Sequence, residues 1–403
     1  MTIPLHDDPA LPGVADLLQD PHTAWADLRE AAPVRRLTGP DGLPFWLVTR
    51  YRDVRALLAD PRLSLDRSHA LPGNYRGFSL PPALDANLLN MDPPDHTRIR
   101  RLVSQAFTPR RVERLREGVR RTAEDLVDAI EPLGRTDLIA SYAGPFPIAV
   151  ICDLLGVSAE DRRDFRGWTD ALVTPDPARP ELARAAVAGL VGYFTDLIAR
   201  KRRDGGDDLL SALVAARDED GDRGRLSEEE LTSLAFLILF AGYENTVHLI
   251  GNGVLALLDH PEQLAALRRD PALLPAAVEE LARFDGPAPL AIRRFPTEDV
   301  RIGDTVVPAG ETVLLALGSA NRDPDHVDRP DELDLHRTDN GHLALGHGIH
   351  YCLGAPLARM ETAIALDTLV RRLPGLALDV PRKDLRWRPS MRARGLLALP
   401  VRY

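Results

Sequence analysis

The sequence predicts a soluble, mainly α-helical protein with a small β portion. Helical hydrophobic patterns run over residues 159–173, 180–203 and 227–259. The β-prone runs are short by comparison. The hydrophobic content of 44% and the charged content of 27% are ordinary for a globular chain.

Charge and cysteine content argue against several classes of protein. The net charge of −10 does not suit nonspecific nucleic-acid binding, which needs a basic surface. Two cysteines, Cys152 and Cys352, in 403 residues make no disulfide scaffold and indicate a reducing compartment. Residues 1–10 lack the features of a signal peptide, and the longest apolar run, residues 234–241, is too short to span a membrane. We therefore expect a cytoplasmic protein that binds neither nucleic acid nor membranes.

The first predicted elements are short. Residues 34–37 and 45–49 flank a Thr-Gly-Pro-Asp-Gly segment and predict a β-hairpin, and residues 53–59 predict a short helix. Residues 60–90 are rich in Pro, Gly and Ser and predict a long loop, which is either functional or disordered. A helix then begins near Asp95, after two prolines.

The later half of the chain carries the long helices. Residues 159–173 and 180–203 predict two helices separated by a turn-rich break at residues 174–177. Ser227 and Glu230 form a capping box at the start of the longest helix, which is hydrophobic nearly all round and should be buried. Short β segments complete the prediction, at residues 300–307, 312–317 and, as a terminal hairpin, 387–399.

Polar residues interrupt the centre of the longest helix. Gly242, Glu244 and Asn245 lie in the segment Ala-Gly-Tyr-Glu-Asn-Thr, residues 241–246. Glycine costs about 1 kcal/mol relative to alanine inside a helix, and a buried carboxylate must be paired or have a raised pKa. Departures of this kind from a regular element often mark function. A close helix–helix contact with a hydrogen-bonded glutamate is the alternative interpretation.

A glycine-rich loop with one cysteine precedes the last predicted helix. It reads Leu-Gly-His-Gly-Ile-His-Tyr-Cys-Leu-Gly over residues 345–354, and Pro356 suits the first turn of the helix that follows. The free N–H groups and the dipole of a helix N-terminus favour a thiolate at Cys352. The glycines leave room for a large flat ligand against the sulfur, and such a thiolate can be the axial ligand of haem iron.

Two other interpretations of Cys352 are open from the residues alone. A lone cysteine is often a small buried hydrophobic residue, as we expect for Cys152 within its apolar run. A zinc site could also form from His342, His347, His350 and Cys352, but a second cysteine pair is missing and the spacing fits no usual zinc pattern.

The loop resembles the cysteine loop of the cytochrome P450 monooxygenases, Phe-Gly-x-Gly-x-His-x-Cys-x-Gly. The matching residues are Gly346, Gly348, His350, Cys352 and Gly354. Leu345 stands where the family usually has Phe, which concerns the tuning of the iron more than its ligation. The resemblance extends from about residue 33 to the C-terminus. It implies a single domain over residues 1–403 with the cytochrome P450 fold, a helical bundle around haem with a long central helix and small β-sheets.

The resemblance also assigns cofactor contacts. It implies haem b, with its iron ligated by the Cys352 thiolate and with His350 on the same loop. His96 and Arg100, one helical turn apart, match the positions that bind the haem propionates, and Arg294 matches the remaining propionate-binding arginine. Donor groups of this kind suit carboxylates.

The polar segment of the longest helix is similar to the family's oxygen-activation motif, Ala-Gly-x-(Asp/Glu)-Thr. The resemblance implies that Gly242 lets the helix open and that Glu244 belongs to a proton relay. Asn245 occupies the usual Thr position, with Thr246 one residue later. Because an amide is not a hydroxyl donor, proton delivery would use water, a substrate hydroxyl or Thr246.

Other positions are implied to be structural or to face the substrate. Glu280, Arg283 and Arg337 resemble the family's structural Glu-Arg set, and the helices at residues 159–173 and 180–203 resemble a mobile lid. A mostly apolar substrate pocket is implied, with candidates Leu89, Ala241, Leu290, Ala291, Ile292 and Ala393.

The resemblance implies a monooxygenase that inserts one oxygen atom from O2 into a small apolar substrate. A ferredoxin and an NAD(P)H-dependent ferredoxin reductase would supply electrons, since no reductase segment is present, and the Arg-rich residues 98–114 would give the docking side a basic character. The sequence of residues 346–359 is similar to that of actinobacterial enzymes that tailor macrolides and other polyketides in antibiotic biosynthesis. The alternatives are a haem enzyme that is driven by peroxide or catalyses a rearrangement, and a non-catalytic P450-like partner of a biosynthetic enzyme.

Overall fold

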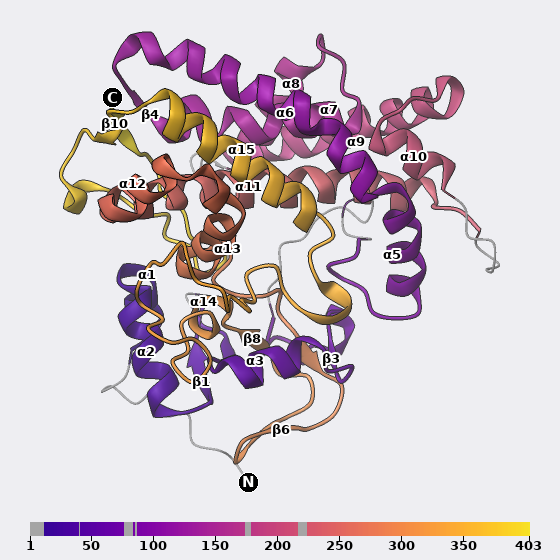
Figure 1. Ribbon diagram of the computed structural model, residues 1–403. Coiled ribbons are helices and arrows are strands. Elements are labelled where there is room, and N and C mark those ends of the chain that lie inside the picture. Colours follow the sequence, from indigo (N-terminus) through magenta and orange to yellow (C-terminus); the bar gives the residue numbers. More distant parts are fainter. Residues whose placement is uncertain (1–11, 40, 76–83, 85–86, 174–178, 217–223) are drawn as a thin grey trace. The chain divides into compact units, whose positions relative to one another are not determined.

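The structure is a computed structural model that describes residues 12–39, 41–75, 84, 87–173, 179–216 and 224–403 (Figure 1). Its helices are α1 (Val14–Gln19), α2 (Pro21–Ala31), α3 (Tyr51–Leu58), α5 (Asp95–Ala106), α6 (Pro109–Ile130), α7 (Pro145–Leu155), α8 (Arg162–Val173), α9 (Pro180–Asp204), α10 (Leu209–Ala215), α11 (Glu228–Asp259), α12 (Pro261–Arg269), α13 (Leu274–Asp285), α14 (Leu317–Ala320) and α15 (Ala355–Arg372). Its strands are β1 (Val34–Thr38), β2 (Pro44–Val48), β3 (Leu63–Ser64), β4 (Arg135–Asp137), β5 (Phe295–Pro296), β6 (Val300–Ile302), β7 (Thr305–Val307), β8 (Val313–Leu315), β9 (Ala377–Leu378) and β10 (Pro400–Arg402). The predicted class, mainly helical with small sheets, is confirmed.

The chain divides into two compact units. The first contains Met1–Phe78, Gly251–Cys352 and Arg382–Leu397, and the second contains Ser79–Ile250, Leu353–Pro381 and Ala398–Tyr403. The expectation of one domain over residues 1–403 stays a prediction.

The first unit is built on a three-stranded sheet of order β1-β2-β8. The predicted hairpin is confirmed, because β1 and β2 pair antiparallel with Val34 opposite Val48, and β8 joins β2 in parallel. Alternate residues of β2 point to opposite faces of the sheet. Phe45 packs with Trp25 and Leu28 of α2, while Val48 packs in a second cluster with side chains of α3. Both faces of β2 are therefore buried.

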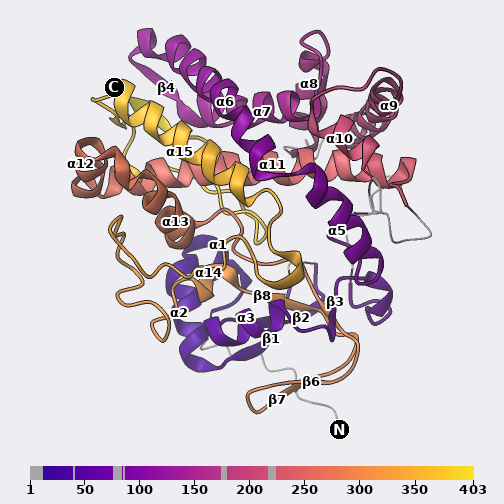
Figure 2. The same ribbon diagram turned by 45° about the vertical axis from the view of Figure 1, so that its right-hand side comes forward.

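The second unit is a bundle of helices. α15 packs against α6, α6 packs against α7, and α8 packs against α9 (Figure 1 and Figure 2). The buried hydroxyl of Tyr142 donates to the Ala365 carbonyl at 3.0 Å and ties α15 to the segment before α7. Cys152 is buried on α7 as expected, and burial raises the pKa of its thiol to about 12. A small sheet of order β4-β10-β9 completes this unit.

The longest helix, α11, begins with the predicted capping box. The Ser227 N–H donates to Glu230 Oε2 at 2.8 Å, and the Glu230 N–H donates to Ser227 Oγ at 3.1 Å. α11 and α9 are both long and apolar enough to cross a membrane by length and composition alone, although no long uninterrupted apolar run was found in the sequence. The apolar window of α11 is 56% buried and that of α9 is 28% buried. Core helices of globular proteins share this composition, so the two helices are weak grounds for a membrane span.

Several predicted elements differ in detail. The described part of residues 60–90 includes β3 and a 3₁₀ turn at Arg67–His69 as well as loop. Residues 76–83, 85 and 86 of this predicted loop, and the turn-rich break at residues 174–177, lie outside the described residues. α8 begins at Arg162, three residues later than expected. The terminal hairpin shrinks to one bridge between Trp387 and Leu396. Its ladder stops because the Arg394 N–H donates elsewhere, to the Pro287 carbonyl at 2.8 Å.

Candidate active site

Cys352 lies on a loop whose ends are joined by its own backbone. The Cys352 N–H donates to the Leu345 carbonyl at 2.8 Å. Gly346 and Gly348 have φ angles of 75° and 73°, in the left-handed region that favours glycine. The Cys352 thiol is half-buried and forms no disulfide. The loop therefore offers a single thiol, three residues before the first residue of α15.

Gly348 is packed tightly against the end of α3. A Cβ at this position would lie 3.1 Å from the Leu58 carbonyl oxygen and from Ala59 Cα, which are backbone atoms. We expect Gly348→Ala to displace the loop and to cost ~1–3 kcal/mol, because the residue also has a positive φ. Since Cys152 is buried, the rate of thiol labelling in the native protein reports Cys352, and this rate should rise. Gly192→Ala on α9, where a Cβ meets open space, is the control, and equal labelling of both variants would contradict the expectation.

The hydrogen bonds of His342 contradict the zinc interpretation of the loop. His342 Nε2 lies 3.1 Å from Glu279 Oε2, and His342 Nδ1 accepts from the Ala344 N–H at 3.2 Å. Both ring nitrogens are thus engaged. Across the described residues, no group of three or more His, Cys, Asp or Glu side chains is placed to hold a metal ion. His347 and His350 are half-buried on the loop.

Arg294 is held near β8 in the first unit. Its backbone exchanges two hydrogen bonds with Val313, each 2.9 Å long, and its side chain is buried. A buried guanidinium needs an anionic or carbonyl partner, so the position is compatible with binding a carboxylate.

Glu280 and Arg283 form the predicted pair on α13 and are the most deeply buried charges of the first unit. Arg283 donates to both oxygens of Glu280 at 2.8 Å, and Arg337 donates to Glu280 Oε2 at 3.2 Å. The Asn340 amide, which no motif in the sequence indicated, also donates to Glu280 Oε2, at 3.0 Å. Arg283 also donates to the carbonyls of Asn321, Pro330 and Glu332. The set therefore fixes the irregular segment before the cysteine loop.

The second unit contains the other predicted cofactor contacts. His96 is buried on α5, and Arg100 lies half-buried one turn later on the same face. Between them, Arg98 is paired with Glu230 of α11. As predicted, α5 begins at Asp95, directly after the two prolines.

The polar segment of α11 is regular helix throughout. Gly242 does not open the helix; a Cβ there would lie 3.4 Å from Ile151 of α7, so the glycine permits close packing. Ala241 and Asn245 are exposed on one face, although the turns on either side are largely buried. The Asn245 amide donates to the Ala241 carbonyl at 3.1 Å. A flat ligand lying on this face would cover both residues.

Glu361 is a candidate that the sequence reasoning missed. Thr246 Oγ1 donates to Glu361 Oε2 of α15 at 3.4 Å, and burial raises the pKa of Glu361 to about 8. A signal was present, since Glu361 follows Met360 within the apolar pattern of the last helix. The pattern did not show that this carboxyl would meet Thr246, because the two residues are far apart in sequence.

The raised pKa of Glu361 predicts a pH-dependent stability. Its ordinary value is 4.5, so between about pH 4.5 and pH 8 the folded protein keeps a proton that the unfolded chain has lost. Stability contributed by this group is complete below pH 4.5 and is lost as pH rises to 8. Glu361→Gln should remove this loss, and its advantage over wild type in unfolding free energy should grow by a few kcal/mol from pH 5 to pH 8.

Urea unfolding at pH 5, 6.5 and 8 measures this difference. Glu229→Gln, at an exposed position of α11, is the matched control and should follow wild type at every pH. A constant difference between Glu361→Gln and wild type would contradict the expectation.

The candidate pocket residues have mixed exposure. Leu290 and Ala393 are buried, Leu89 and Ala291 are half-buried, and Ile292 is exposed. Their role in binding substrate stays a prediction.

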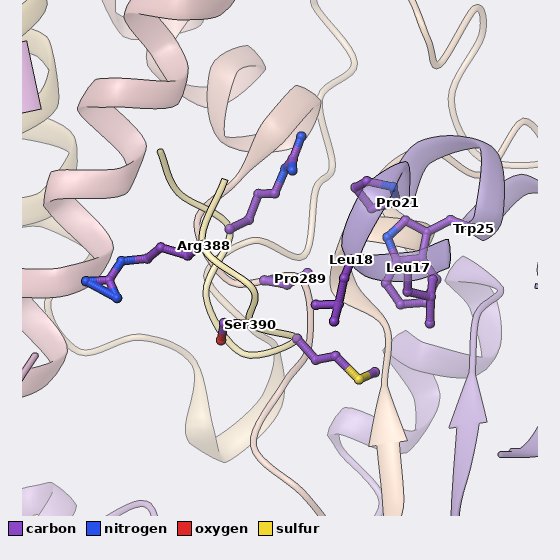
Figure 3. A pocket seen from close by; sticks show the side chains of 9 residues that line it. Leu17, Leu18, Pro21, Trp25, Pro289, Arg388 and Ser390 are labelled. Atoms are coloured by element: carbon purple, nitrogen blue, oxygen red, sulfur yellow. The ribbon is translucent and has the colours of Figure 1, made fainter. Parts of the chain in front are cut away.

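A small cavity lies in the first unit beside Ala393. It is lined by Leu17, Leu18, Pro21, Trp25, Pro289, Arg388, Ser390, Met391 and Arg394. Its volume of about 20 Å³ has room for about one water molecule. Because of this volume, the cavity is too small for a substrate. Figure 3 shows the side chain of Arg388 directed away from Leu17, Leu18 and Trp25.

Comparisons of the sequence and of the structure with known proteins all indicate the same class of protein. A family model described as cytochrome P450 matches residues 183–384. The chain is 50% identical to the cytochrome P450 monooxygenase PikC of Streptomyces venezuelae over 395 residues, covering 96% of this chain and 92% of PikC. It is 44% identical to the 6-deoxyerythronolide B hydroxylase of Saccharopolyspora erythraea over 404 residues, covering 96% and 98% of the two chains. The ligand-free structure of the P450 monooxygenase TamI matches with a TM-score of 0.89 and 46% identity, covering 98% of this chain and 94% of TamI.

These matches define an oxidoreductase with a mainly helical fold. The agreement covers nearly the whole chain and includes both the α11 segment and the cysteine loop. The chain belongs to the cytochrome P450 family, in which a cysteine thiolate ligates haem iron.

Proposed function

We propose that the protein is a haem-thiolate monooxygenase that hydroxylates or epoxidises an apolar secondary metabolite of the macrolide or polyketide type. The observation that carries the proposal is the half-buried thiol of Cys352 on a loop shaped by two glycines with positive φ. The similarity to 6-deoxyerythronolide B hydroxylase supports the substrate class.

The donor set fits haem b. Cys352 offers one soft sulfur for iron, and His96, Arg100 and Arg294 offer donors for the propionate carboxylates. The exposed face at Ala241 and Asn245 suits a flat ligand. When bound, haem supplies the binding of O2 and the cleavage of its O–O bond.

The chain's own residues hold and move protons. At neutral pH Glu361 is largely protonated, because its pKa is about 8, and it can exchange a proton with the Thr246 hydroxyl through their hydrogen bond. Glu244 is the second carboxyl of the relay. The Asn245 amide donates to the Ala241 carbonyl, so in this proposal the Thr246 hydroxyl takes the role of the family's threonine hydroxyl. A proton held at Glu361 can thus reach the Thr246 hydroxyl on α11 although Asn245 occupies the family's usual threonine position.

Electrons would come from a ferredoxin and an NAD(P)H-dependent ferredoxin reductase, and the protein would be cytoplasmic. The predicted basic stretch is less basic than expected, since Arg98 pairs with Glu230 and Arg114 pairs with Asp207. Arg101 and Arg110 are exposed. An acidic ferredoxin would be steered to such arginines, with reduction rates that fall as salt increases.

Product formation with isotopic oxygen tests the proposal. A panel of macrolactones, steroids and fatty acids is first screened for a shift of the iron spin state. The substrates that respond are then incubated with ¹⁸O2, ferredoxin, reductase and NAD(P)H, or with hydrogen peroxide alone. One ¹⁸O atom per product from O2 supports the proposal. Turnover with peroxide alone favours the peroxide-driven alternative, and a spin-state response confined to steroids or fatty acids overturns the substrate class.

A further inference from the structure

His248 lies one turn after Glu244 on α11. Its Nε2 is 3.7 Å from Oε1 of Glu244. Residues four apart share a helix face, and a glutamate placed N-terminal to its partner is the favoured order. Only 3% of the His248 side chain is exposed, against 16% for Glu244. The pair thus runs from a buried ring to a carboxylate that solvent or a ligand can reach.

The His248 ring has an unusual environment for a buried polar group. Within the described part of the chain, neither Nδ1 nor Nε2 makes a hydrogen bond, although buried polar groups are generally bonded. A distance of 3.7 Å is too long for a direct hydrogen bond. A small rotation of either side chain closes it, or one water molecule bridges it.

The neighbouring polar side chains of α11 bond to other groups. The Tyr243 hydroxyl donates to Asp170 of α8 at 3.4 Å. The Asn245 amide donates to a backbone carbonyl of its own helix, and Thr246 donates to Glu361 of α15. None of these three bonds involves Glu244, whereas His248 Nε2 lies 3.7 Å from the Glu244 carboxylate.

We propose that His248 is a positioning residue for Glu244. Its Nε2–H donates to Glu244 Oε1 and holds the carboxylate in one rotamer, so that Glu244 presents its other oxygen for proton transfer. His248 acts through Glu244 and touches neither substrate nor cofactor. This inference rests on the proposed role of Glu244 in the relay.

A double-mutant cycle tests the coupling. His248→Leu removes the donor at similar volume, and Glu244→Gln removes the acidic group. His248→Leu should lower kcat roughly tenfold, leave KM unchanged and divert more reducing equivalents to peroxide, whereas His248→Gln, which keeps an N–H donor, should restore most of kcat. In the Glu244→Gln background, His248→Leu should have no further effect. An equal loss in both backgrounds, or a change in KM alone, overturns the proposal.

A second readout needs no turnover. In protein labelled with ¹⁵N-histidine, the His248 ring signals are assigned by their loss in His248→Gln. Wild type should show a proton on Nε2, and Glu244→Gln should shift the His248 signals and leave those of the other histidines in place. Unshifted His248 signals overturn the contact even if His248→Leu does not fold. Full activity of Glu244→Gln with shifted signals would instead refute the relay role of Glu244 and leave the contact standing.

Discussion

Replacement of Cys352 by serine is expected to abolish the red-shifted Soret band of the ferrous carbonyl complex and, with it, substrate oxidation. The hydroxyl of serine is a hard and weakly acidic ligand, whereas a thiolate donates the electron density that favours O–O cleavage. The Gly346 and Gly348 geometry does not depend on the sulfur, so the loop should keep its backbone.

The comparison variant is Cys152→Ala, which changes the other cysteine at a buried position of α7. It should keep the red-shifted band and lose only some stability through a small cavity. Carbonyl difference spectra of both purified variants, normalised to haem content, make the measurement. A red-shifted band retained in Cys352→Ser would show that Cys352 is not the iron ligand and would refute the proposed mechanism.

The largest expected loss of stability follows from Arg283→Ala. The change leaves Glu280 fully buried with its main partner gone, and removing one member of a buried ion pair costs about 3–5 kcal/mol. Arg337 and Asn340 still donate to Glu280, which places the effect at the lower end of that range. Three carbonyl groups of the segment before the cysteine loop also lose their donor.

Urea unfolding followed by circular dichroism measures this loss. Arg329→Ala serves as the matched control, because Arg329 pairs with Asp328 and Glu332 at the exposed surface, where ion pairs contribute little. Arg283→Lys keeps the charge but not the fork of donors and should fall between wild type and Arg283→Ala. If Arg283→Ala unfolds together with Arg329→Ala, the buried set has no special role in stability.

Local patterns carried most of the sequence predictions. The β1–β2 hairpin, the capping box of α11 and the Glu280–Arg283 pair each join residues close in sequence, and spacing alone is enough to predict such contacts. The cysteine loop was found in the same way, because its glycines and its cysteine fall within one short segment.

Contacts between segments far apart in the sequence could not be predicted from local patterns. Glu361 and Thr246 are 115 residues apart in the sequence, and the parallel pairing of β8 with β2 likewise joins distant segments. Periodicity shows which face of an element is buried, but it does not name the partner. His248 was missed for a different reason, since a histidine one turn after a glutamate on an apolar helix has no motif of its own.

The small sheet of the second unit has a further consequence for synthesis. Its central strand is β10, and β4 and β9 each pair with β10. Nearly two thirds of the sequence lies between β4 and β10. During translation, residues 135–137 therefore lack the strand that they pair with here until residues 400–402 have been synthesised. A chain stalled or truncated before those residues would carry that unpaired segment and be prone to association with other nascent chains.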